Sequence, residues 1–248
     1  MIARFLASLS LPILLLAAVP SPTEHLGFQP GADYRLADYA ALRSYFDKLA
    51  RSSDRIKLVE FGRSSLGQPM ILAFISSAEN IRGLERFRQI SRKLALGEAS
   101  EAEARQLARE GKAVVWIDSG LHASEVAPVQ HSFDLAYQLL TDESEEGSLI
   151  RDRVILLQAP CINPDGLDWI AHWYARNRGT PHELAPLPHL YHKYAGHDNN
   201  RDWFMMNLAE TRHVSRILYE EWFPQIIYNQ HQAPPFRRAF SSRPMPSR

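Results

Sequence analysis

The stretch WIDSGLHASEVAPVQ, residues 116–130, decides the fold of this chain. Its first residues end the apolar run AVVWI, which predicts a buried strand, and the following Ser-Gly pair predicts a turn. A helix is expected from about Glu125 to Leu140, so His122 and Glu125 lie three apart where the strand passes into the helix. Two interpretations are open here. The pair binds a metal ion, or Glu125 is a polar residue in the first turn of a helix.

Strands and helices alternate on both sides of this stretch. Residues 56–61 and 70–75 are apolar and flank a polar link, which predicts a β-hairpin. The run VILLQAP, residues 154–160, predicts another buried strand, and residues 226–228 predict a short final one. Continuous apolar runs are typical of parallel strands that are covered on both faces. The sequence therefore predicts an α/β fold in which a mostly parallel mixed sheet is flanked by helices.

Helical periodicity is clear in some connections and missing from one. Apolar residues recur at helical spacing over residues 36–49, and residues 205–223 predict a further helix. Residues 80–111 are charged and helix-prone, with a break near Gly97, and predict two surface helices. Residues 171–203 show no clear periodicity and are rich in His, Pro and Asn. A loop of that length is usually functional or disordered.

Composition and the N-terminus restrict the class of protein. The 28 Lys and Arg residues balance 28 Asp and Glu residues, so neither nucleic acid nor an acidic membrane surface is indicated as a partner. Residues 1–20 contain Arg4 and then an apolar run ending in small residues, which predicts a signal peptide; an uncleaved membrane anchor is the alternative. We expect an exported protein, periplasmic or secreted, that meets a membrane only during export. Cys161 is the only cysteine, which excludes an intramolecular disulfide and a cysteine-based metal site.

Polar segments follow three predicted strands at their carboxyl ends, where open α/β sheets place their sites. His122 and Glu125 follow the first strand, the segment NPDG (163–166) follows the second, and His231 follows the third. Two imidazoles and a carboxylate that leave one position open suit a hydrolytic zinc ion. His-x-x-Glu alone is a weak signal, and it is the order of the segments that favours a metal site.

Four motifs in this order resemble the zinc carboxypeptidases, the carboxypeptidase A-like metallopeptidases. The motifs are HASE (122–125), NPDG (163–166), NNRDW (199–203) and YNQHQ (228–232), and FGRSSLGQPM (61–70) is also similar to a segment of the family. The resemblance implies a partial zinc carboxypeptidase-like catalytic domain over residues 26–233. It also implies Zn²⁺ as the cofactor and, as the substrate, a peptide with a free C-terminus that is hydrolysed by metal-activated water.

The resemblance assigns the zinc ligands, which are His122, Glu125 and His231. It assigns Asn200 and Arg201 to the terminal carboxylate of the peptide, a task that suits the planar fork of a guanidinium. The family also has an arginine shortly after NPDG that polarises the scissile carbonyl and stabilises the oxyanion. Arg178 fits that spacing best, and Arg176 is the alternative.

Other polar residues of the irregular region are expected to have supporting roles. His189, His192 and His197 are spaced like a second metal site, but we expect them to line or cover the cleft. We expect Asp198 and Asp202 to be hydrogen-bonding residues of the loop and not catalysts.

The family's general base is a glutamate downstream of the last zinc ligand, and residues 232–248 contain neither Asp nor Glu. A general base contributes about 10²–10⁴-fold to the rate. We therefore expect a C-terminally truncated family member that is inactive or nearly so. Residues 234–248 are expected to be an aberrant or disordered tail, of the kind that a frameshifted or incomplete copy would carry, and the exposed sheet edge is expected to destabilise the domain.

Two other functions remain open on the sequence. A zinc amidase acting on cell-wall peptides or N-acyl amino acids would use the same metal ligands and the same carboxylate contact. A non-catalytic zinc- or peptide-binding remnant would keep the cleft without the base. The sequence indicates neither the side-chain specificity nor the oligomeric state.

Overall fold

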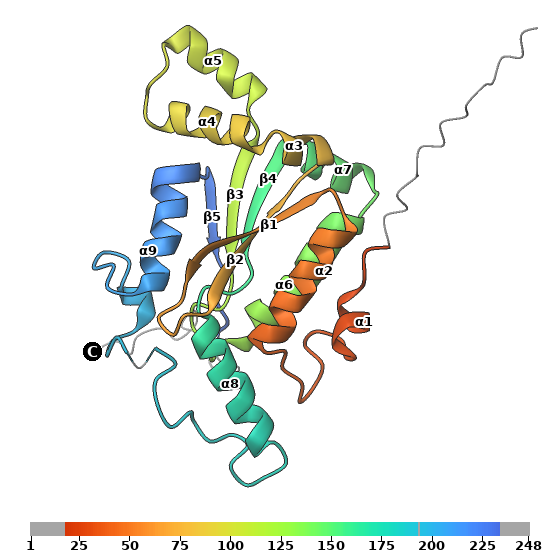
Figure 1. Cartoon of the computed structure of the whole chain (residues 1–248), viewed down its shortest axis with the longest axis vertical. Coiled ribbons are helices and arrows are strands. Elements are labelled where there is room, and N and C mark those ends of the chain that lie inside the picture. The colour runs from red at the N-terminus through yellow and green to blue at the C-terminus, as the bar shows by residue number, and fades with distance from the viewer. Residues whose placement is uncertain (1–17, 193, 234–248) are drawn as a thin grey trace, which may run out of the picture.

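The computed structural model describes residues 18–192 and 194–233, which fold around a five-stranded mixed sheet (Figure 1). The strands are β1 (Ile56–Arg63), β2 (Pro69–Ile75), β3 (Ala113–Asp118), β4 (Val154–Ala159) and β5 (Ile226–Asn229), in the order β1-β2-β4-β3-β5. Most of the predicted signal peptide and the whole predicted tail at 234–248 lie outside the described residues.

The sheet has an antiparallel half and a parallel half. β1 and β2 form the predicted hairpin, and β2 is also antiparallel to β4. β3 is parallel to both β4 and β5, so these three strands end at the same edge of the sheet. Parallel neighbours need long crossover connections, which here contain the helices α6 (Val126–Thr141), α7 (Glu145–Arg153) and those that precede β5. The mixed α/β sheet flanked by helices is therefore confirmed.

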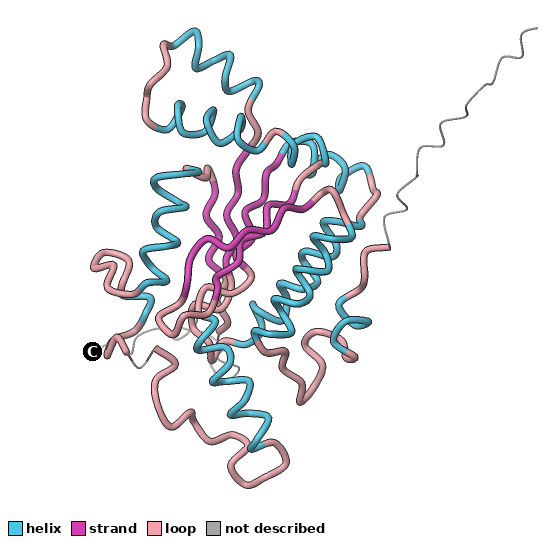
Figure 2. The backbone as a smooth tube through the Cα atoms, viewed as in Figure 1, coloured by secondary structure: helices cyan, strands magenta, loops and turns pink. Residues whose placement is uncertain are grey.

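Helices cover both faces of the sheet because successive strand residues point to opposite faces. On β2, Met70, Leu72 and Phe74 join the core beneath α4 (Leu84–Ala95), α9 (Ala209–Arg216) and the π-helical turn η2 (Ile217–Trp222). The alternate residues Ile71, Ala73 and Ile75 join the core beneath α2 (Tyr39–Ser52) and α6. Figure 2 shows the strands as the central layer between these two sets of helices.

Three further helices begin at serine caps. They are α1 (Pro22–Leu26), α3 (Ala78–Arg82) and α5 (Glu101–Glu110). The Ser100 side chain accepts a hydrogen bond from the Glu103 N–H at the start of α5, and Ser77 accepts one from Asn80 at the start of α3. None of the helices in the described ranges has both the length and the apolar character needed to cross a membrane.

One segment differs from the sequence-based expectation. Residues 171–177 were expected to be irregular, but they belong to α8 (Pro164–Asn177). This helix has its N-cap at Asn163, which accepts from the Gly166 N–H, and it begins with Pro164, which suits a first helical position. Only Leu167 and Ala171 continue its buried side, so its apolar stripe is too short to show as periodicity.

The open edge of the sheet is apolar. Ile226, Ile227 and Tyr228 of β5 are 56%, 45% and 55% exposed. Within the described residues, β5 pairs with β3 alone. An unpaired apolar edge is a site where another strand can add to the sheet.

Candidate metal centre

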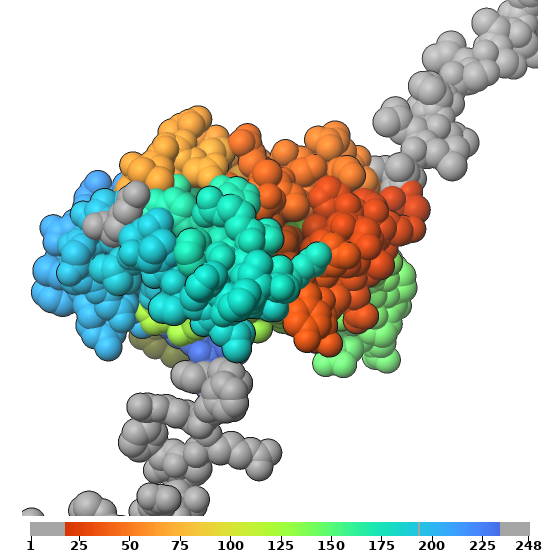
Figure 3. Space-filling model, turned by 90° about the horizontal axis from the view of Figure 1, so that it is seen from below, coloured from red at the N-terminus to blue at the C-terminus, as the bar shows by residue number. Residues whose placement is uncertain are grey.

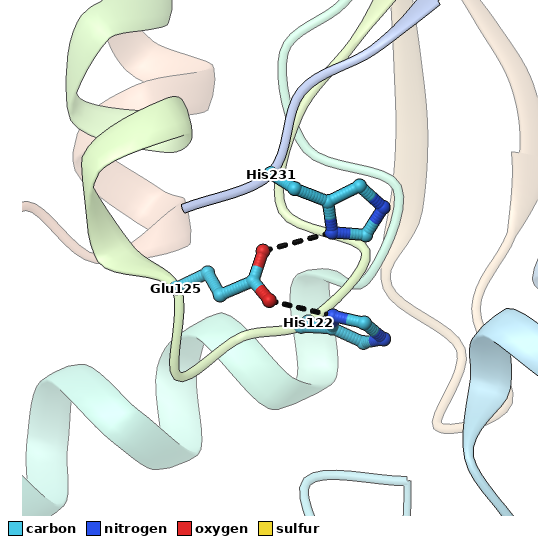
Figure 4. Close-up of side chains that lie close together, drawn as sticks. All are labelled: His122, Glu125 and His231. Atoms are coloured by element: carbon cyan, nitrogen blue, oxygen red, sulfur yellow. Dashed lines mark hydrogen bonds and ion pairs between the residues drawn. The ribbon is translucent and has the colours of Figure 1, made fainter. Parts of the chain in front are cut away.

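Three side chains converge at the carboxyl edge of the parallel strands (Figure 4). His122 Nδ1 lies 2.8 Å from Glu125 Oε1, and His231 Nδ1 lies 2.9 Å from Glu125 Oε2. One donor atom from each residue lies within 4.8 Å of the other two, and this is the one such cluster found in residues 18–192 and 194–233. The structure therefore brings together the three residues that the resemblance assigned to zinc.

The loop that carries His122 is shaped by a glycine and two asparagines. The chain turns after β3 at Gly120, whose φ of +72° lies in the region that favours glycine. A Cβ at this position would lie 2.6 Å from Val129 Cγ2, so there is also no room for a side chain. The Leu121 carbonyl accepts hydrogen bonds from Asn163 Nδ2 at 3.2 Å and from Asn199 Nδ2 at 2.6 Å. Three segments from different parts of the sequence are thereby joined beside His122.

The pairing of β5 with β3 places His231. These strands are parallel, with Asn229 opposite Asp118, so both chains leave the sheet at the same edge. The Gln232 N–H then donates to Glu125 Oε2 at 2.9 Å, and the Gln232 side chain accepts from the Ala127 N–H at 2.9 Å. The segment after β5 is therefore hydrogen-bonded to the first turn of α6.

A buried carboxyl group supports the two strand ends. Asp118 is 2% exposed and accepts hydrogen bonds from Trp116 Nε1 at 2.6 Å and from the Asn229 side chain. Burial raises the pKa of Asp118 to about 6, and these two hydrogen bonds limit the increase. Asp118 thus links the strand that leads to His122 with the strand that leads to His231.

The outer nitrogen of His122 is also held. Asp198 Oδ1 lies 3.0 Å from His122 Nε2 and accepts from the Asn200 N–H at 2.8 Å. A carboxylate at the outer nitrogen of a histidine orients the ring, which here would present Nδ1 to a metal ion. Burial acts to raise the pKa of Asp198, but the Asn200 N–H and His122 hold it below its ordinary value.

The donor set fits a zinc ion. Zinc binds imidazole nitrogen and carboxylate oxygen at about 2.0–2.2 Å, commonly with three protein ligands when a position stays open for reaction. Burial acts to raise the pKa of Glu125, but the Gln232 N–H and the two histidines hold it below its ordinary value, which favours the ionised form that a metal needs. His122, Glu125 and His231 would hold the ion, and Asp198 would orient His122.

Asn200 and Arg201 lie next to this centre, in the 3₁₀ turn η1 (Asn199–Arg201) that begins at Asp198. Asn200 Oδ1 accepts from Trp203 Nε1 at 3.0 Å, which directs its amide NH₂ group away from that contact. The exposed Arg201 side chain donates one N–H to the Asn200 carbonyl at 3.0 Å, and its other donors have no hydrogen-bond partner among the described residues. Both side chains can therefore donate to a carboxylate.

Arg178 is not brought to the centre. It follows the last residue of α8, a helix that begins beside the metal loop and extends about 21 Å at 1.5 Å per residue. Its guanidinium donates to the Tyr34 carbonyl at 3.0 Å, whereas Arg176 lies 5.9 Å from the centre of the Trp173 ring. The oxyanion role of Arg178 stays a prediction.

The remaining histidines of the irregular region have separate surroundings. His192 is 5% exposed and shares a small cavity with Asn199, and its Nδ1 has no hydrogen-bond partner among the described residues. His197 bonds Asp202 at 3.1 Å, and His189 stacks edge-on against Trp169. These three histidines do not form a second metal cluster within the described ranges.

Sequence reasoning missed the contact between Asp198 and His122. Asp198 was predicted to be a loop hydrogen-bonding residue, and its contact with His122 gives that bond a role at the metal centre. The signal available in the sequence was an acidic residue two positions before the predicted carboxylate-binding pair.

Solved structures share this fold at low sequence identity. A metallo-carboxypeptidase from Burkholderia cenocepacia matches with a TM-score of 0.51 and 18% identity, over 80% of this chain and 42% of that one. Thrombin activatable fibrinolysis inhibitor matches with a TM-score of 0.51 and 12% identity, over 86% and 52%. The bovine form of that protein, in complex with tick carboxypeptidase inhibitor, gives 0.50 and 13%, over 81% and 62%. The chain thus spans between 42% and 62% of the length of these structures.

The sequence itself gives a family match. No curated protein matches the chain. The family model Peptidase_M14, described as zinc carboxypeptidase, matches residues 42–226, which is most of the chain and includes His122, Glu125, Asn200 and Arg201. The chain belongs to the zinc carboxypeptidase family.

Proposed function

We propose that this chain binds zinc and the free C-terminus of a peptide, as part of a metallocarboxypeptidase that hydrolyses C-terminal peptide bonds. The observation that carries the proposal is the convergence of three donors within 4.8 Å at the carboxyl edge of the sheet. Asp198 connects this cluster directly to the turn that contains Asn200 and Arg201. A zinc ion supplies a Lewis acid that polarises a carbonyl group and lowers the pKa of water.

The residues of the chain divide the remaining tasks. His122, Glu125 and His231 would hold the ion, and Asp198 would orient the His122 ring through its outer nitrogen. The Arg201 guanidinium and the Asn200 amide hold the terminal carboxylate through charge-assisted hydrogen bonds, which fixes the position of the last peptide bond.

Proton transfer is the task for which the chain offers no assigned residue. Glu125 and Asp198, the carboxylates of the cluster, both contact the histidines. We propose that neither of these two carboxylates acts as the general base, a role that contributes about 10²–10⁴-fold to the rate. We also propose export, from the signal-peptide pattern of residues 1–20, which N-terminal sequencing of the protein recovered outside the cytoplasm would test.

Peptide binding tests the proposal. A fluorescein-labelled peptide with a free C-terminal carboxylate is expected to bind the zinc-loaded chain about tenfold more tightly than the same peptide with a C-terminal amide, because one charge-assisted pair is lost. Arg201→Ala should abolish the difference, and Arg109→Ala, which removes an arginine from the distant helix α5, should leave it unchanged. Equal affinity of the carboxylate and amide peptides for the wild-type chain would contradict the proposal.

A further inference from the structure

A wide cleft lies at the carboxyl edge of the parallel strands, on the α6 side of His122, Glu125 and His231. The cleft encloses about 750 Å³, which lies within the size range of about 300–1,000 Å³ that is typical of ligand pockets. Its walls are residues 30–36, the first turns of α6, the middle of α8 and residues 183–187. Ser124, Val126 and Gln232 also line it, and each is a sequence neighbour of Glu125 or His231. The cleft therefore opens directly beside the metal centre.

The cleft and the carboxylate-binding pair lie on opposite sides of the His122 ring. Nδ1 of this ring faces Glu125, at the start of α6, while Nε2 faces Asp198. Figure 4 shows the ring directed away from Glu125 and α6, so that its outer nitrogen is on the far side. Asn200 and Arg201 follow Asp198 in the same turn. A peptide whose carboxylate is held by this pair, and whose last peptide bond lies at the metal, therefore continues toward the cleft.

The walls of the cleft are tied to one another by hydrogen bonds. Arg178 donates to the Tyr34 carbonyl at 3.0 Å and so links the end of α8 to residues 30–36. Trp173 Nε1 donates to the Ala185 carbonyl at 3.2 Å, and the Tyr174 hydroxyl donates to Glu183 at 3.0 Å. Figure 3 shows the N-terminal segment, in red, against the teal part of the chain, which includes α8. These contacts form the cleft without a ligand.

The lining of the cleft is apolar with an excess of negative charge. Leu184 is 94% exposed and Tyr34 is 64% exposed, so both present apolar surface that a ligand would cover. Among the described lining residues, the carboxylates of Asp33, Asp134 and Glu183 outnumber the single guanidinium of Arg35. Asp134 has no ion pair with any residue that the structure describes. Such a lining favours apolar side chains and side chains with positive charge.

We infer that this cleft binds the part of a peptide that precedes the last peptide bond, and that it prefers leucine-like and lysine-like side chains there. The inference rests on the proposed function, which places the terminal carboxylate at Asn200 and Arg201. It gives the enzyme a preference for peptides longer than two residues. It also gives Arg178 a positioning role, since this side chain holds the wall that contains Tyr34.

Fluorescence anisotropy with two labelled peptides on the zinc-loaded full chain tests the inference. One is a dipeptide with a free carboxylate, and the other is a hexapeptide that ends in the same two residues and has leucine and lysine at its first four positions. We expect the hexapeptide to bind about tenfold more tightly, because burying one or two apolar side chains contributes at least one factor of ten. Replacing its lysines by glutamate is expected to weaken binding about fivefold.

Leu184→Ser is the matched variant for the cleft, and Leu149→Ser is its control, because Leu149 is 55% exposed on α7 away from the cleft. Leu184→Ser should lower the affinity for the hexapeptide about fivefold and leave the affinity for the dipeptide unchanged, while Leu149→Ser should change neither affinity. A thermal unfolding curve for each variant checks that it is folded.

The outcomes separate the cleft from the carboxylate site. Equal affinity for the two peptides, or an unchanged affinity of Leu184→Ser for the hexapeptide, contradicts the inference that the cleft binds peptide. If Arg201→Ala leaves the affinity for both peptides unchanged while Leu184→Ser lowers the affinity for the hexapeptide, the inference about the cleft holds and the proposed carboxylate contact is wrong. If neither peptide binds, both are wrong.

Discussion

Zinc affinity should depend on Asp198 through two separable effects, orientation and charge. Asp198 Oδ1 is shared by His122 Nε2 at 3.0 Å and by the Asn200 N–H at 2.8 Å. In Asp198→Asn, the amide oxygen can accept both hydrogen bonds, so only the charge is lost. In Asp198→Ala, the orientation of His122 and the start of η1 are lost as well.

The size of each effect follows from the exposure of the side chain. Losing an outer partner of a metal-bound histidine typically costs about 10–100-fold in affinity. The Asp198 side chain is 45% exposed, so water replaces part of the interaction and we expect the lower end, about tenfold or about 1.4 kcal/mol, for Asp198→Ala. The charge alone contributes less than about 1 kcal/mol at this exposure, so Asp198→Asn should lower the zinc affinity by about threefold.

Competition with a fluorescent zinc chelator at a fixed pH measures both dissociation constants. Asp54→Ala is the control, since Asp54 is an exposed aspartate in the turn before β1 and makes no contact with the centre. Wild-type zinc affinity in Asp198→Ala would refute the reasoning. Equal losses in the Asn and Ala variants would show that charge, and not orientation, is what Asp198 supplies.

Two further predictions concern the loops that hold the site. Asp202 has a fully buried carboxylate that accepts from the Leu208 N–H at 2.9 Å, so Asp202→Ala should lower the free energy of unfolding by about 3 kcal/mol in urea titrations. Burial acts to raise the pKa of Asp202, but the N–H donors hold it below its ordinary value. The stabilisation from Asp202 is therefore present above about pH 4 and should be lost as the pH falls through the lowered pKa. A difference in unfolding free energy between wild type and variant that stays constant down to acid pH would contradict this. Gly120→Ala adds a close contact with Val129 to a positive φ and should cost about 2–4 kcal/mol, whereas Gly179→Ala, with φ of +73° and no atom within 4 Å, should cost only about 1 kcal/mol; equal losses would argue against the contact.

The sheet and the convergence of His122, Glu125 and His231 could be predicted because their signals are local and repeated. Apolar runs identified the strands, and the position of each polar segment after a strand placed His122, Glu125 and His231 at one edge. Parallel pairing of β3 with β5 then brings residues that are more than 100 positions apart into contact.

The features that could not be predicted depend on where a helix carries its side chains and on contacts between segments that are distant in the sequence. Spacing placed Arg178 at a family position, but spacing does not reveal that α8 continues to Asn177 and carries the side chain to the Tyr34 carbonyl. The contact between Asp198 and His122 joins residues from different loops, so no local pattern reports it. The cleft was missed for the same reason, because residues 30–36 and 183–187 are brought together only by the folded chain.

The most direct test of the central claim is X-ray absorption spectroscopy of the zinc-loaded chain, with the zinc content measured after dialysis. The account predicts one zinc ion per chain with two imidazole ligands and one carboxylate, and one imidazole fewer in His231→Ala. A chain that retains no zinc, or a count of imidazoles that His231→Ala does not change, would contradict it.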